Sequence, residues 1–208
     1  MKLVSPTGKK ISFDNKKLVF DAPPPPGPSP IIIDGVEYDV VQIGNQYWTT
    51  KDLNLNLNTD NEIHANGVGY YGFSTLNTAI NEYLQNNGLS TWRVPTLSDM
   101  RTLINFVKSD NGLSSDKDVC PYLYKVNAQS YYQTNDKYGF ALEAHGAYDN
   151  NLQQLVNDYT GGNANVGYTT SSTSSTYRSY FGNAGPAYGE GAANRYKVVV
   201  RLVMDAEV

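Results

Sequence analysis

Tyrosine, asparagine and arginine side chains recur between residues 159 and 195, within a long segment rich in Gly, Ser and Thr. Tyrosine offers a flat contact surface with a polar tip, and asparagine and arginine add hydrogen bonds, so the combination is suited to gripping a sugar ring or a protein epitope. We therefore predict a ligand-binding surface on these loops. Its members are Tyr159, Tyr168, Tyr177, Arg178, Tyr180, Asn183, Tyr188, Asn194 and Arg195. In the alternative interpretation, several of these tyrosines only pack the loops onto a sheet.

Residues suited to catalysis are few, since the chain has two histidines and one cysteine. Cys120 precedes a proline in an apolar-leaning stretch, which is typical of a packed thiol rather than a nucleophile. His64 lies in a polar segment and His145 follows Glu143, and an acid–base pair would need a partner that the sequence does not place. We predict surface or hydrogen-bonded structural histidines, no catalytic residue, no enzyme activity and no cofactor.

Two acidic groups are candidates for a calcium site, because Ca²⁺ prefers oxygen ligands. One group is Asp110 with Asp116 and Asp118, and the other is Asp149 with Asp158. Neither has the regular ligand spacing of a dedicated calcium loop. We predict no metal site, with a structural cation as the alternative.

Length and composition exclude several classes of protein. A chain of 208 residues suits one main domain with a small additional piece. Because 16 Lys and Arg face 20 Asp and Glu, the net charge of -4 lacks the basic surface that nucleic-acid binding needs. The sequence has no apolar run of about 18 residues, so we expect no membrane insertion. No secretory signal is readable at its start.

The first 30 residues divide into two parts. Apolar residues on either side of Asp14-Asn15 predict a short β-hairpin within residues 1–21, which we interpret as a docking element. The residues expected to dock are Ile11, Phe13, Leu18 and Phe20. A disordered tail is the alternative. Residues 22–30 follow as a proline-rich linker that acts as a semi-rigid spacer, so the main domain spans residues 31–208.

The main domain has the pattern of an α+β fold. Turn residues and periodicity predict a hairpin over 36–48 with Gly44-Asn45 as its turn, and irregular chain over 51–66. Two helices follow, at 76–84 with a cap at Ser74 or Thr75, and from Leu97 to Asn111 with a cap at Thr96 and Asp99. Strands are expected over 119–126, 138–148 and 196–204, with loops over 150–194.

Four blocks of sequence, in order, resemble one known family. They are Gly44-Asn45-Gln46-Tyr47-Trp48-Thr49-Thr50-Lys51-Asp52-Leu53-Asn54, then Trp92-Arg93-Val94-Pro95-Thr96, then Tyr138-Gly139-Phe140-Ala141-Leu142, and finally Val200-Arg201-Leu202-Val203. Together they resemble the Fibrobacter succinogenes major paralogous domain, which implies a C-type lectin-like fold over roughly residues 34 to 205. Leu202 stands where the family usually has cysteine. The tripeptides with which calcium-type lectins hold Ca²⁺ do not occur, so the resemblance implies a scaffold for variable loops rather than calcium-dependent sugar binding.

The resemblance and the N-terminal layout together suggest an anchor, a stalk and a head. We expect a phage virion protein, a fibre or decoration protein located in the virion. Its N-terminus would dock on a capsid or tail protein, and its C-terminal loops would contact a host-surface glycan or protein. A homotrimer would add avidity to weak single contacts. The alternatives are an adhesin on the bacterial cell surface and a purely structural capsid decoration protein.

Overall fold

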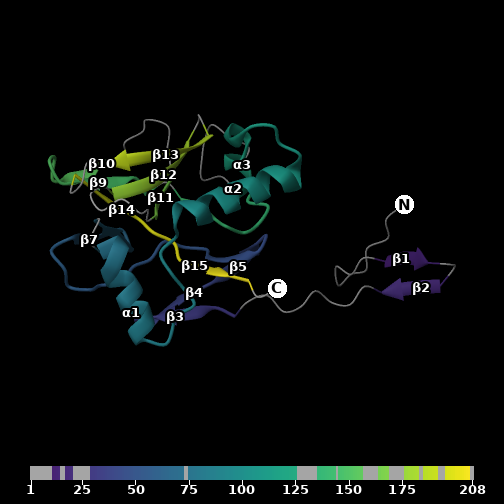
Figure 1. Ribbon diagram of the computed structural model, residues 1–208, viewed down its shortest axis with the longest axis horizontal. Coiled ribbons are helices and arrows are strands. Elements are labelled where there is room, and N and C mark those ends of the chain that lie inside the picture. Colours follow the sequence, from purple (N-terminus) through teal and green to yellow (C-terminus); the bar gives the residue numbers. More distant parts are fainter. Residues whose placement is uncertain are drawn as a thin grey trace.

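The computed structural model describes residues 11–14, 17–20, 29–72, 75–125, 135–143, 145–156, 164–168, 176–182, 185–191 and 195–206. These ranges form an α+β fold of mostly antiparallel sheets and few helices, as expected (Figure 1). The helical elements are η1 (Thr75–Ala79), α1 (Ile80–Asn86), α2 (Leu97–Asn111), η2 (Asp116–Asp118) and α3 (Cys120–Leu123). The strands are β1 (Ile11–Asp14), β2 (Lys17–Phe20), β3 (Ile31–Ile33), β4 (Val36–Tyr38), β5 (Val40–Ile43), β6 (Gln46–Thr49), β7 (Glu62–Ala65), β8 (Val68–Tyr71), β9 (Ala147–Asp149), β10 (Gln154–Val156), β11 (Ala164–Tyr168), β12 (Thr176–Gly182), β13 (Gly185–Gly191), β14 (Tyr196–Val198) and β15 (Val203–Asp205).

The N-terminal strands form a sheet of their own. β1 pairs with β2 in antiparallel register, with Ile11 opposite Phe20 and Phe13 opposite Leu18. The predicted hairpin is therefore confirmed. The docking role of its four apolar residues stays a prediction.

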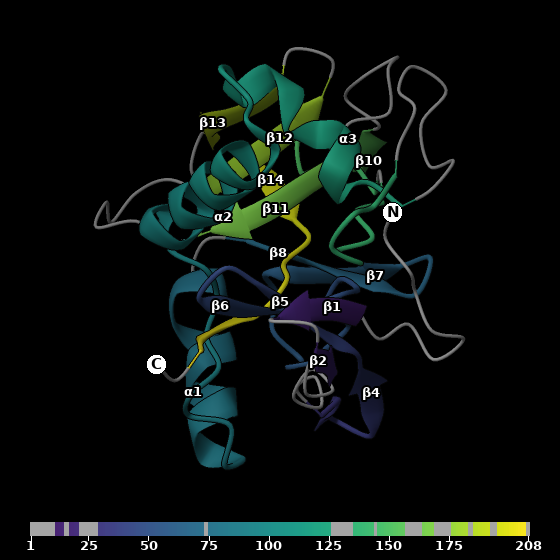
Figure 2. The same ribbon diagram turned by 90° about the vertical axis from the view of Figure 1, so that its right-hand side faces the viewer.

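A three-stranded sheet, β15–β6–β5, separates two hydrophobic cores of the main domain. Alternation along β6 sends Trp48 into the core that α2 and α3 cover, and Tyr47 toward the core that contains α1. On β15, Val203 likewise lies in the core that α2 and α3 cover, and Met204 packs against the core that contains α1. Figure 2 accordingly shows α2 and α1 on opposite sides of β5 and β6.

Local sequence signals specify α2 closely. The Thr96 side chain accepts a hydrogen bond from the Asp99 backbone while the Asp99 side chain accepts one from the Thr96 backbone, which completes the predicted capping box. Gly112 ends the helix with a left-handed φ of 63°. The buried face consists of Asp99, Met100, Leu103, Ile104 and Val107.

The first helix is also present, but its predicted cap is wrong. Leu76, Ile80 and Leu84 are buried as the periodicity predicts. Thr75 instead lies inside η1, a π-helical turn, where its hydroxyl group donates to the Asn61 carbonyl at 3.5 Å. Ser74, the other predicted cap, lies outside the described residues.

Two hairpins differ from the sequence-based expectations: residues 36–38 pair with β3 and not with the rest of the predicted 36–48 hairpin, and a second hairpin begins within the segment expected to be irregular. The turn Asp34-Gly35 joins β3 to β4, and Asn66-Gly67 joins β7 to β8. All four residues have positive φ, between 49° and 78°, as a two-residue hairpin turn of this kind requires. The prediction of irregular chain over 51–66 is therefore wrong at its end. The predicted Gly44-Asn45 turn between β5 and β6 is confirmed.

Three predicted strands are wrong in whole or in part. Residues 119–126 contain α3, where Pro121 occupies the first turn, a position that costs proline no hydrogen bond. Within 138–148 the positive φ of Ala141, 52°, interrupts any strand, although Phe140 and Leu142 are buried as the alternation predicts. The strand in this region is β9.

The last predicted strand, 196–204, splits between two sheets. β14 lies inside the five-stranded sheet β10–β9–β14–β8–β7, and β15 pairs with β6. The residues between them, Val199 to Leu202, are buried and cross from one sheet to the other. Their backbone pairs instead with the segment after β6, since Leu53 donates to the Val200 carbonyl at 2.8 Å.

The predicted loops over 150–194 are largely strands where they are described. β10 joins the five-stranded sheet, and β11, β12 and β13 form a separate antiparallel sheet. Among the helices in the described ranges, none combines the length and apolar character that crossing a bilayer requires.

Residues from all four sequence blocks meet around Trp48. This side chain is completely buried, and its ring meets that of Phe140 edge-on at 5.6 Å between centroids. Val203 pairs with Trp48 across the sheet and also forms a β-bridge with Arg93. Four segments that are far apart in the sequence therefore converge on one point of the core.

Candidate functional site

The tyrosine-rich surface predicted from the sequence falls largely on one sheet. Tyr168 of β11 pairs with Tyr177 of β12, and Ser179 of β12 pairs with Tyr188 of β13. Because paired positions share a face and successive positions alternate, the register places positions 168, 177 and 188 on one face and positions 178 and 180 on the other. The set is thus brought together in one sheet but divided between its faces. Tyr159, Asn183 and Asn194 lie outside the described residues.

Arg195, the last member of that set, is held by an acidic residue. Its Nε and Nη2 atoms donate to Oδ2 of Asp149 at 3.1 and 3.0 Å, and its guanidinium lies over the Tyr196 ring. Burial raises the pKa of Asp149, but the bonds from Arg195 and from the backbone of Asn151 and Leu152 outweigh it, so that its pKa lies below the ordinary value. Arg195 therefore links β14 to the β9–β10 turn.

A second cluster of charged residues lies at the crossing segment between β14 and β15. The Arg201 side chain is almost completely buried, and its Nε donates to Oδ1 of Asp52 at 2.9 Å. Its two remaining nitrogens donate to the carbonyl oxygens of Phe140 and Ala141. Each polar group of the guanidinium thus has a partner, as a buried charge requires.

His145 extends this cluster toward the surface. Its Nδ1 atom lies 2.6 Å from Oδ2 of Asp52, and its Nε2 atom lies 3.3 Å from Oε2 of Glu143. The hydrogen bond to Asp52 raises the pKa of His145, against the opposing effect of burial. Glu143 also forms an ion pair with Lys125. The prediction of a hydrogen-bonded histidine is confirmed for this residue.

This geometry favours an imidazolium that donates from both ring nitrogens, one to each carboxylate. An imidazolium has no free lone pair with which to accept a further proton. Five charged side chains form a series of ion pairs from the surface to the core, with alternating sign: Lys125, Glu143, His145, Asp52 and Arg201. Its chemistry is that of charge pairing.

The cluster opens into a pocket of about 370 Å³. The pocket is lined by Thr50, Lys51, Asp52, Asn66, Gly67, Val68, Lys125, Ala141, Glu143, His145 and Arg201. Its size is near the lower end of the roughly 300–1,000 Å³ typical of small-molecule sites, which suits one small ligand. Four of the lining side chains are basic, counting His145, and two are acidic.

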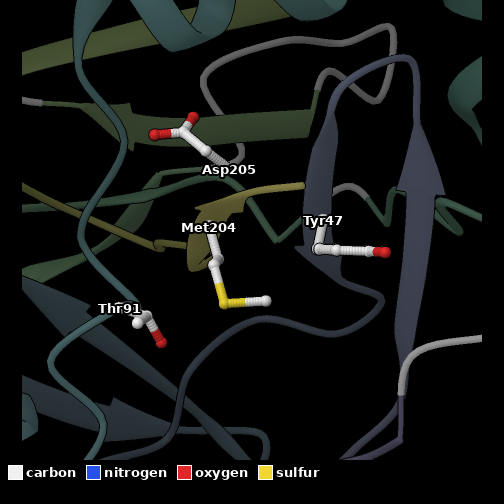
Figure 3. Close-up of a pocket in the computed structure, with 4 residues that line it drawn as sticks. All are labelled: Tyr47, Thr91, Met204 and Asp205. Carbon is white, nitrogen blue, oxygen red and sulfur yellow. The ribbon is translucent and has the colours of Figure 1, made fainter. Parts of the chain in front are cut away.

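A second cavity, of about 440 Å³, lies beside β6 and β15. Figure 3 shows the side chains of Thr91 and Met204 pointing into the same space, whereas the Asp205 carboxylate turns away from Met204. Asp205 accepts a hydrogen bond from Nη2 of Arg93 at 2.9 Å. Among the described residues that line this cavity, Asp205 is the only charged one, so they do not show the converging charges of the Asp52 pocket.

Most of the remaining candidates have structural partners, and Asp158 lies outside the described residues. Cys120 is buried in the core, which confirms the prediction of a packed thiol. His64 lies on β7 with Nδ1 2.7 Å from Oδ1 of Asn54. Asp110 accepts from Lys137, and Asp116 pairs with Lys108. Within the described ranges, no three His, Cys, Asp or Glu side chains converge as metal ligands do.

The Asp52 pocket is absent from the sequence-based predictions, although the sequence contains a signal for it. Arg201 is a charged residue inside an otherwise apolar run, and such a residue predicts a buried carboxylate partner. The partner is 149 positions away, so the sequence does not say which carboxylate it is.

Comparisons with known proteins add no assignment. No protein-family model matches the chain, and no curated protein and no solved structure shows a significant match to it.

Proposed function

We propose that this chain is a non-enzymatic binding module, in which the N-terminal hairpin docks on a virion structural protein and the head contacts a host-surface glycan or protein. The observation that carries the proposal is the separate sheet of β1 and β2, which precedes the proline-rich residues 22–30. An isolated two-stranded hairpin is marginally stable in water, and a partner that covers its apolar residues would stabilise it.

The head is proposed to be a C-type lectin-like domain related to the Fibrobacter succinogenes major paralogous domain. The convergence of the four sequence blocks around Trp48 supports this proposal, because residues that define a common fold are expected to meet in its core. In such a fold, function depends on the surface that the scaffold presents.

The environment of His145 supports binding rather than catalysis. Its ring lies between the carboxylates of Asp52 and Glu143, which stabilise the charged imidazolium form. A general base needs a neutral nitrogen that faces the substrate.

Binding of the labelled full-length chain to bacterial cells tests the head. We expect saturable binding, which Tyr177→Ala or Tyr180→Ala weakens, and thermal unfolding verifies that each variant is folded. Since positions 177 and 180 lie on opposite faces of the β11–β13 sheet, the variant that loses binding identifies the contacting face. Equal binding by all variants would exclude this sheet as the contact surface.

Deletion of residues 1–21 tests the anchor. We expect virus particles that lose the truncated protein while the full chain is retained. Retention of the truncated protein would contradict the docking role. Envelope localisation without any particle would favour a bacterial adhesin, and loss of particle stability with unchanged adsorption would favour a purely structural decoration protein.

A further inference from the structure

We propose that the Asp52 pocket binds an acidic sugar through its carboxylate, and that this carboxylate takes the position that Glu143 occupies between Lys125 and His145. The inference rests on the proposed function, since it names the class of glycan that the head recognises. It places this sugar in the Asp52 pocket, in addition to the contact that the β11–β13 sheet is proposed to make.

The position of Glu143 carries the inference. One of its carboxylate oxygens pairs with the Lys125 ammonium group, and the other lies 3.3 Å from Nε2 of His145. Two cations therefore converge on one carboxylate at the wall of a pocket. This arrangement marks a position where a ligand carboxylate is stabilised.

The charge balance of the pocket favours an anion once Glu143 moves away. Asp52 and Arg201 form a buried pair whose charges offset each other. With His145 protonated, the imidazolium and Lys125 then face the vacated position, and the exposed Lys51 also lines the pocket. An incoming carboxylate thus replaces the charge that Glu143 supplies.

The exchange requires little rearrangement. The Lys125 and Glu143 side chains are 58% and 38% exposed, and an exposed ion pair contributes little to stability. Asp52, by contrast, is 2% exposed and bound by both Arg201 and His145. Glu143 is therefore the carboxylate that a ligand displaces, and Asp52 keeps His145 in place.

A sugar ring fits the rest of the pocket. Thr50 and Asn66 supply a hydroxyl and an amide group to its wall, which are suitable partners for ring hydroxyl groups. Gly67 has open space around the position of a Cβ atom, so the β7–β8 turn leaves room for the ring. The volume of about 370 Å³ suits one monosaccharide unit at the end of a glycan.

Calorimetric titration of the full chain with glucuronate, glucose and acetate tests this site. We expect glucuronate to bind more tightly than acetate, and glucose not to bind at millimolar concentration. Lys125→Gln should weaken glucuronate binding roughly tenfold or more, as expected for loss of a charge-assisted hydrogen bond. Glu143→Gln should tighten it, because glutamine keeps the shape but does not compete for the two cations.

Lys137→Gln is the matched control, since Lys137 forms a similarly exposed pair with Asp110 and is not among the residues that line the pocket. Thermal unfolding of each variant verifies that it is folded. Equal affinity of the Lys125→Gln variant and the unmodified chain would overturn the inference, as would a lack of glucuronate binding. Equal affinity for acetate and glucuronate would leave a carboxylate site but exclude the sugar.

Cell binding separates this inference from the proposed function. If the chain binds cells but not glucuronate, the site assignment fails and the binding role stands. If the chain binds glucuronate but no cells, the pocket is a ligand site and the host-attachment role fails.

Discussion

Arg201 and Asp52 form an ion pair across 149 positions of sequence, with 2.9 Å between Nε and Oδ1 and with side chains only 1% and 2% exposed. The pair connects the crossing segment near the C-terminus to the chain just after β6. Because His145 binds the second oxygen of Asp52, the same pair holds the inner wall of the pocket.

Arg201→Met should lower the free energy of unfolding by roughly 3–5 kcal/mol, because it leaves the buried Asp52 with one cation fewer. The carbonyl groups of Phe140 and Ala141 also lose their donors. Urea denaturation measures the change. Asp52→Asn in the Arg201→Met background should recover part of the loss, because it removes the uncompensated charge. A loss below about 1 kcal/mol in the single variant would contradict the assigned role of the pair.

The stability of the head should depend on pH through His145. Its pKa is raised in the folded chain, first by the hydrogen bond to Asp52, and Glu143 adds to this effect while Arg201 opposes it. The imidazolium therefore contributes its full stabilisation below the unfolded pKa of about 6.5, and the contribution is lost as pH rises through the folded pKa. Urea unfolding at pH values below and above these two pKa values should show a decline in the free energy of unfolding. The His145→Gln variant should lack this decline. Parallel pH curves for the two proteins would contradict this assignment.

Thr96→Ala should cost about 1 kcal/mol of stability, because it removes the side chain that caps α2. The Thr96 hydroxyl oxygen accepts from the Asp99 backbone at 3.2 Å. Thermal or urea unfolding measures the loss, with Thr96→Ser as the control that keeps the hydroxyl group. The cap would be irrelevant if Thr96→Ala and Thr96→Ser were equally stable.

Gly44 and Gly67 offer a matched pair of substitutions to alanine. Both have positive φ, 64° and 78°, so each variant should lose about 1–2 kcal/mol from backbone strain. A Cβ atom at Gly44 would lie 2.8 Å from the Phe106 ring, whereas at Gly67 nothing lies within 4 Å. Gly44→Ala should therefore lose a further ~1–3 kcal/mol in unfolding experiments. In the Phe106→Ala background this additional loss should disappear, and its persistence would show that the ring is not its cause.

Short-range signals gave the parts of the fold that the sequence predicted well. The capping box of α2 needs only Thr96 and Asp99, three positions apart, and the β5–β6 turn needs only Gly44-Asn45. Asp34-Gly35 and Asn66-Gly67 are also two-residue turn signals, but the hairpins that they form are not among the predictions. Those errors came from missed turn chemistry rather than from long-range effects.

The errors elsewhere depend on tertiary structure. The apolar run 196–204 suits one strand, but the buried Arg201 and the crossing between two sheets divide it. The pocket could not be predicted for the same reason, since Asp52, Lys125 and His145 come from distant segments. The tyrosine positions of β11–β13 were identified as a group, but the register that divides them between two faces depends on strand pairing.

The crossing segment and β15 have a consequence for synthesis on the ribosome. Trp48 pairs with Val203, and the Leu53 backbone bonds to Val200, so the centre of the head is completed only by the crossing segment and β15. Such long-range pairing cannot form while the nascent chain is still short. The apolar segments around Trp48 therefore stay without their partner strand until residues 200–203 have been synthesised.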